Sequence, residues 1–152
     1  MKIFRLVLIC GAVMVSAGSA LAHMNTDPEV SYRQSLFHVI GWNFSPLGAM
    51  NKGKIPFDAK EATLRADRLA ALAPQILEGF RKAPSADAKT DAQPLIWKQF
   101  DDFTSKANAL VEQTKLLAEA THSGDEAKFK AQFAKTAEAC KNCHEKYKKD
   151  DD

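Results

Sequence analysis

Apolar residues recur along this chain at steps of three and four, in long runs rich in Ala, Leu, Lys, Glu and Gln. Pro and Gly gather at a few places between these runs, where they predict the ends of helices. The first predicted helix has Asp27 as its N-cap and Pro28 at its first position. It continues to about Met50, and Pro46 is a potential point of kinking.

A connection over 51–57 leads to a second helix, for which Asp58 is the expected cap with Glu61 three positions later. Pro74 is expected to disturb its last turns. Its predicted buried positions are Ala62, Ala66, Leu69, Ala73, Ile76 and Phe80. The stretch 81–93, rich in Pro, Ser, Ala, Asp and Lys, is predicted to be a loop.

Two further helices complete the chain, one beginning at Pro94 and ending at Ser123-Gly124, the other capped by Asp125. The third helix should bury Phe100, Phe103, Ala107, Leu110, Thr114 and Leu117, and the fourth Phe129, Phe133, Ala137, Cys140, His144 and Tyr147. The sequence contains no run typical of a strand. Four amphipathic helices with mostly short connections predict an all-α fold, an antiparallel four-helix bundle.

The first 22 residues differ from the rest, because two basic residues precede an apolar run that ends in Ala20-Leu21-Ala22. This pattern is typical of a secretory signal peptide cleaved after Ala22. We therefore expect 1–22 to be a leader and 23–152 to be one exported domain. Neither the leader nor any later segment has the apolar length of a membrane helix, so no membrane partner is expected.

Charge adds little to this picture. The leader carries Lys2 and Arg5, and without them the 19 acidic residues are balanced by as many basic ones. A chain close to neutrality does not favour nucleic acid or an anionic membrane as a partner.

The strongest chemical signal is Cys140-Lys-Asn-Cys143-His144, a C-x-x-C-H motif. Residues three and four apart share one face of a helix. Both thiols can therefore bond to one edge of a porphyrin while the adjacent imidazole reaches the iron. The motif predicts one covalently bound haem c, with Cys140 and Cys143 as thioether donors and His144 as the axial iron ligand.

Two other uses of a C-x-x-C pair fit less well. A thioredoxin-like disulfide would need a βαβ context, which this helical sequence lacks. A structural zinc site would need a second pair of ligands at zinc-finger spacing, and none is found.

Several further segments make the sequence similar to one family, the class II c-type cytochromes, and within it to cytochrome c prime. The similarity covers nearly the whole of 23–152, with the attachment motif near the C-terminus. It includes Tyr32-Arg33-Gln34-Ser35, the segments 52–58 and 91–97, and the C-terminal Cys140 to Tyr147.

The resemblance implies a bacterial periplasmic protein with haem between the helices, partnered by redox proteins, and a homodimer packed through the first two helices. It also implies that Arg33, Gln34 and Asp91 lie near the haem, with Arg33 paired to a propionate, a geometry suited to a guanidinium. Without the resemblance, Arg33 would be expected on a solvated face.

The position opposite His144 separates members of the family. Some low-spin relatives have a ligating Met on the first helix where this chain has Phe37. A phenyl ring has no lone pair for iron, so Phe37 is expected to cover an open face of a five-coordinate, high-spin haem. Other potential ligands are His38, which is rotated about 100° around the helix from Phe37, Met50, and His23 or Met24 near the N-terminus.

Two functions follow from these expectations. An iron behind an apolar lid favours small uncharged ligands such as NO and CO. The alternative is a low-spin, six-coordinate cytochrome that acts purely as an electron carrier. An enzyme is not expected, because a peroxidase-like reaction would need a distal acid or base, for which only an inward-turned His38 would serve.

Overall fold

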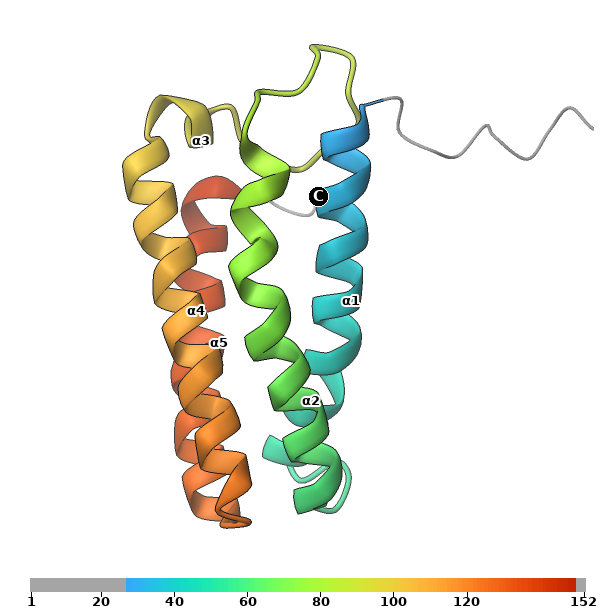
Figure 1. Ribbon diagram of the computed structural model, residues 1–152, viewed down its shortest axis with the longest axis vertical. Helices are drawn as coiled ribbons and strands as arrows, with labels where there is room; N and C mark the ends of the chain where they lie inside the picture. The colour runs from blue at the N-terminus through green and yellow to red at the C-terminus, as the bar shows by residue number, and fades with distance from the viewer. Residues whose placement is uncertain (1–26, 150–152) are drawn as a thin grey trace, which may run out of the picture.

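The computed structural model describes residues 27–149, which form one elongated bundle (Figure 1). The predicted leader 1–22, His23 and Met24 lie outside the described residues. In chain order the helices are α1 (Pro28–Asn51), α2 (Ala59–Leu72), the 3-10 helix η1 (Ala73–Phe80), the short α3 (Leu95–Lys98), α4 (Phe100–His122) and α5 (Glu126–Tyr147).

Three aspartates cap helices as predicted. The Asp27 carboxylate accepts hydrogen bonds from the amides of Glu29 and Val30 at 3.0 and 3.1 Å. Asp58 accepts one from Glu61 N at 3.0 Å. Asp125 caps α5 in the same way. Each side chain takes up amide donors that the first turn of a helix leaves without a partner, which fixes where the helix begins.

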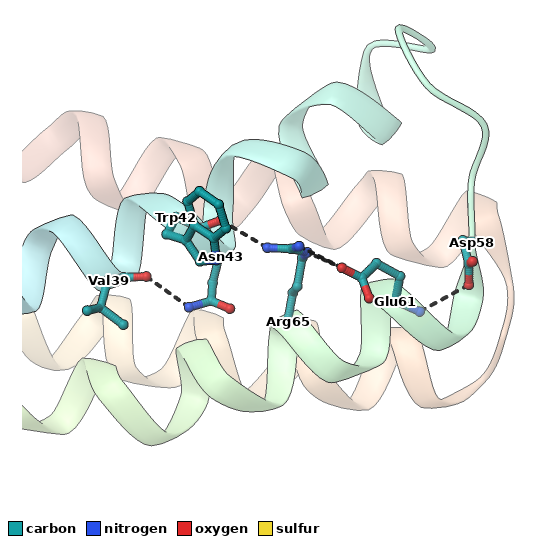
Figure 2. A network of polar contacts seen from close by, with 6 residues as sticks. All are labelled: Val39, Trp42, Asn43, Asp58, Glu61 and Arg65. Atoms are coloured by element: carbon teal, nitrogen blue, oxygen red, sulfur yellow. Dashed lines mark hydrogen bonds and ion pairs between the residues drawn. The ribbon is translucent and has the colours of Figure 1, made fainter.

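The first helix runs without interruption through Pro46. Because proline has no N–H, the carbonyl of Trp42, one turn earlier, loses its helical donor. Arg65 of α2 replaces that donor, since its Nη1 lies 3.0 Å from the Trp42 oxygen. Figure 2 shows this bond, with Arg65 held in place by Glu61 at 2.6 Å. A gap in α1 is thus filled from α2, which ties the two helices together.

The second predicted helix changes its geometry near Pro74. The α-helix ends at Leu72, and the chain continues as the 3-10 helix η1. The predicted buried stripe is nevertheless confirmed, because Ala73, Ile76 and Phe80 are buried with the positions before them.

The third predicted helix is divided in two. The backbone at Gln99 leaves the helical region, with φ −131° and ψ 47°, so α3 and α4 are separate helices rather than one beginning at Pro94. Before the break, Ile96 is buried and the Trp97 indole donates to the carbonyl of Phe80 at 3.0 Å. After it, Phe100 is 37% exposed, so the prediction that it is buried is wrong.

Two apolar clusters fill the bundle, one toward each end. The turn-end cluster consists of Leu47, Met50, Ala62, Ala66, Leu69, Leu117, Phe129 and Phe133. The motif-end cluster consists of Leu36, Ala73, Ile76, Phe80, Ile96, Phe103, Ala107 and Tyr147. The first lies near the short connections between α1 and α2 and between α4 and α5, and the second near the C-terminus of α5.

Successive long helices run in opposite directions, so the all-α antiparallel four-helix bundle is confirmed (Figure 1). The start of α1, the loop 81–94 and the end of α5 meet at one end of the molecule. Within 27–149 the only β-type pairing is an isolated bridge between Ala92 and Lys148. Among the same residues, no helix is long and apolar enough to cross a membrane.

Replacing Arg65 by methionine should lower the free energy of unfolding by about 1 kcal/mol, because the Trp42 carbonyl loses its donor. In a Pro46→Ala background the same replacement should cost less, since the new backbone amide at position 46 can then donate to Trp42. Urea denaturation of the four proteins measures this coupling. Equal losses in both backgrounds would show that Arg65 does not compensate for Pro46, and Arg68→Met, on an exposed side chain of the same helix, provides the control.

Candidate functional site

The C-x-x-C-H motif lies entirely within α5, as its spacing predicted. Cys140 and Cys143 are half-buried free thiols, whereas His144 is exposed. The predicted stripe is therefore wrong at His144, whereas its members Ala137 and Cys140 are half-buried. The fully buried positions are Phe129, Phe133, Thr136 and Tyr147. The buried face of α5 is therefore rotated from the predicted one. It includes Thr136 together with Phe133 and Tyr147, and it leaves His144 exposed.

Burial governs the chemistry of both thiols. It raises the pKa of Cys140 to about 11, and a negative charge on Cys143 would raise it further. Burial also raises the pKa of Cys143, an effect that the nearby Lys106 opposes. Both side chains are therefore neutral thiols at neutral pH, and Cys143 packs against the motif-end cluster.

Cys143 and Phe37 pack against the same motif-end cluster, from α5 and α1 respectively. The Phe37 ring meets Phe80 edge to face, with 6.4 Å between ring centroids. Phe37 is half-buried and also forms one edge of a groove on the outer side of α1. The bundle thus brings Phe37 of the first helix and the Cys143 thiol of the last one to the same apolar cluster.

Arg33 is a buried cation at the motif end of α1, with only 3% of its surface exposed. Its Nη1 donates to the carbonyl of Gly79 at 3.0 Å and its Nη2 to Thr90 Oγ1 at 3.3 Å. Burial lowers the pKa of Arg33, and the charges of Asp27 and Glu29 partly offset this effect. Its Nε is buried without a hydrogen-bond partner, and within 27–149 no carboxylate forms an ion pair with Arg33.

Gln34 of α1 and Asp91 are both exposed, and both belong to the contacts of one strap of loop, residues 89–93, which contains Asp91. Gln34 donates from Nε2 to the carbonyl of Lys89 at 3.0 Å. The carbonyl of Asp91 accepts from Lys149 N at 2.8 Å, and Gln93 N donates to the carbonyl of Tyr147 at 2.9 Å. The strap therefore connects the start of α1 to the chain that follows the C-x-x-C-H motif.

The alternative iron ligands lie elsewhere. His38 is exposed and lines the outer groove of α1 together with Trp42 and Arg65. Met50 is buried in the turn-end cluster, beside Leu47 and Phe129. Neither belongs to the motif-end cluster that Phe37 and Cys143 share.

A polar contact closes the C-terminus of α5 against α4. The Tyr147 hydroxyl donates to Asp102 Oδ2 at 2.5 Å, and Lys146 Nζ lies 2.9 Å from the same oxygen. The hydrogen bond from Tyr147, followed by that from Lys146, lowers the pKa of Asp102. The aromatic ring of Tyr147 remains buried in the motif-end cluster, edge to face with Phe103.

These residues fit a covalent haem. Two free thiols on one helical turn are the donors that thioether bonds require, and the imidazole of the next residue is the donor that iron requires. A buried guanidinium with an unpartnered nitrogen suits an anionic group such as a propionate, because burying a cation without an anion is costly.

Comparison with known proteins places the chain in a family. Residues 28–148 match the family described as Cytochrome C'. Cytochrome c' of Rubrivivax gelatinosus is 34% identical over 119 residues, which are 78% of this chain and 92% of that protein. The chain belongs to the cytochrome c' family. Its cofactor is accordingly a covalently bound haem c with its iron.

Solved structures agree with this assignment. Cytochrome c prime from Shewanella frigidimarina is 44% identical with a TM-score of 0.76, over 80% of this chain and 94% of that one. The nitric oxide complex of a leucine-to-alanine mutant of cytochrome c prime from Alcaligenes xylosoxidans is 29% identical with a TM-score of 0.72, over 81% of this chain and 94% of that one.

Two residues that contact Arg33 were not predicted from the sequence, namely Gly79 and Thr90. They lie 46 and 57 positions from Arg33 along the chain, and neither belongs to a motif or a helical stripe. Trp97 lies in the segment 91–97, but nothing in its sequence pattern predicts the contact with Arg33, whose Cζ lies 5.6 Å from the centroid of the Trp97 ring.

Proposed function

We propose that the protein binds NO and CO at a five-coordinate, high-spin haem and exchanges electrons with redox partner proteins. The observation that carries this proposal is the placement of Phe37, half-buried against the cluster that also contacts Cys143. The nitric oxide complex of the Alcaligenes xylosoxidans relative supports NO as a ligand class.

In this proposal, Cys140 and Cys143 hold the haem by thioether bonds, and His144 supplies the axial nitrogen for the iron. The two thiols would hold the haem through its vinyl groups, because addition of an S–H across a vinyl double bond gives a thioether without an oxidant. When bound, the haem would supply an iron for ligand binding and for one-electron redox chemistry. Arg33 pairs with a propionate, while Gln34 and Asp91 contact the haem from the strap.

Phe37 offers carbon and hydrogen only, so it keeps water and charged ligands away from the open position and tolerates small uncharged molecules. Among residues 27–149, the alternative ligands that would make the protein a low-spin electron carrier are His38 and Met50. His38 lies on the outer face and Met50 in the turn-end cluster. The exposed position of His38 also supports a non-enzymatic role, because no distal acid or base then assists a peroxidase-like reaction.

The leader 1–22 suggests where the protein acts. Its basic start, apolar run and Ala20-Leu21-Ala22 ending are those of a cleaved signal peptide. We therefore propose a periplasmic protein that begins at His23.

A homodimer through α1 and α2 is the proposed assembly. The Trp42 side chain is 72% exposed, and Val39 and Leu64 are 47% and 45% exposed on the same two helices. Trp42 lines a groove of about 480 Å³, to which Arg65 of α2 also contributes. Figure 2 shows Trp42 and Arg65 where the two helices approach each other. A large exposed indole beside a groove is typical of an interface.

Intact mass spectrometry under denaturing conditions tests attachment and export together. The exported protein should have the mass of residues 23–152 plus one haem. Changing both Cys140 and Cys143 to alanine should remove the haem mass, because no thioether can form. The Cys10→Ala change is the matched control, since Cys10 leaves with the leader and its loss should alter neither result. A haem that remains attached in the double variant would disprove the assigned donors.

Optical spectra of the holo-protein test the open iron position. The dithionite-reduced wild type should give a high-spin spectrum that shifts when CO or NO is added. The Phe37→Met variant should become low-spin and respond more weakly to CO, because a thioether then stands where the phenyl ring was.

The control for this experiment is Phe44→Met, which changes a ring stacked on Phe133 at 4.7 Å beside the turn-end cluster. It should keep the high-spin spectrum of the wild type. A wild-type spectrum that is low-spin and indifferent to CO would instead identify the protein as an electron carrier with a sixth ligand from the chain.

The mass of the assembly in solution tests the dimer. Trp42→Asp should convert a dimer into a monomer in light scattering, because a carboxylate would be buried against the second copy. Leu116→Asp, at a 43% exposed position on α4, should leave the dimer intact. Identical masses for both variants would argue against an interface on α1 and α2.

A further inference from the structure

Two hydrogen bonds and two aromatic rings hold the Arg33 guanidinium in place. Two hydrogen bonds hold its terminal nitrogens, to the carbonyl of Gly79 and to the Thr90 hydroxyl. The rings of Phe80 and Trp97 lie on its Cζ at 5.0 and 5.6 Å from their centroids, within the range of cation–π attraction. A long side chain that would otherwise sample many rotamers therefore has one position.

Gly79 makes this arrangement possible by its lack of a side chain. A Cβ at this position would lie 2.6 Å from the Arg33 Cβ and 3.2 Å from the Tyr32 ring. Only glycine lets η1 approach α1 so closely that its carbonyl reaches Arg33 Nη1.

Thr90 connects Arg33 to the other side of the site. Its Oγ1 accepts from Ala92 N at 3.2 Å as well as from Arg33. Its carbonyl accepts from Lys149 Nζ at 2.9 Å. The position of the Arg33 head is thus set together with that of the chain that follows His144 on α5.

The third nitrogen of the guanidinium, Nε, has no hydrogen-bond partner among residues 27–149. Arg33 Nε is buried without an acceptor, and no carboxylate among residues 27–149 forms an ion pair with Arg33. A buried donor of this kind costs about 1–3 kcal/mol unless a ligand accepts from it.

We propose that Gly79 and Thr90 are positioning residues, which occupy both terminal nitrogens of Arg33 so that Nε is left to donate to a haem propionate. This inference rests on the proposed haem site and deepens it. The arrangement explains why a cation is buried at this end of the bundle, with its charge fixed beside a redox centre rather than free to swing into water.

The haem midpoint potential of the holo-protein tests the inference. A fixed guanidinium favours the electron added on reduction, so Thr90→Val, which removes the Oγ1 acceptor, should lower the potential. The expected change in the ferric–ferrous equilibrium is up to about tenfold, or ~59 mV for one electron. Thr90→Ser retains the acceptor and should restore the potential of the wild type.

Thr63→Val is the matched control. Thr63 is also half-buried, but its hydroxyl bonds to the carbonyl of Ala59 near the start of α2. The haem midpoint potential of the Thr63→Val protein should equal that of the wild type. A fully loaded Thr90→Val protein with the potential of Thr63→Val would overturn the inference, even if its melting temperature fell, because Thr90 would then be structural only. A wild type without covalent haem would overturn both this inference and the proposed function.

Discussion

A cation buried in a small helical bundle has to be held by neighbours, and Arg33 meets this constraint where α1, η1 and the strap 89–93 come together. The carbonyl of Gly79, the hydroxyl of Thr90 and the rings of Phe80 and Trp97 surround its guanidinium. These groups offset part of the desolvation cost but supply no negative charge. The motif end of the bundle is therefore arranged around a positive charge that a bound anion can complete.

Further along α1, a contact with α2 compensates for a proline in the helix. Pro46 interrupts the hydrogen bonds of the helix, and Arg65 of α2 supplies the missing donor to Trp42 while pairing with Glu61. This contact lies beside the indole of Trp42 (Figure 2). The indole is exposed and lines an open groove. One helix thus buries Arg33 and exposes His38 and Trp42. Phe37 is half-buried between these two sides, where it contacts the motif-end cluster and also lines the outer groove.

The motif end of the bundle has an apolar interior that contacts Phe37 and Cys143. The motif-end cluster contacts both Phe37 and Cys143, and Tyr147 closes it below the motif through its bond to Asp102. Burial keeps both thiols neutral, because it raises the pKa of each. In the proposed function, the same low polarity favours uncharged diatomic ligands over water and anions.

The sequence by itself determined the helices, their caps and the attachment motif, because these depend on neighbours within a few positions. Asp27, Asp58 and Asp125 cap as predicted, and the motif lies on one helical turn. Only the tertiary structure decided the break at Gln99, the exposed side of His144 and the surroundings of Arg33. Those depend on contacts such as Arg33 with Thr90, 57 positions apart, and no local pattern encodes which distant carbonyl or hydroxyl a buried side chain will meet once the helices pack.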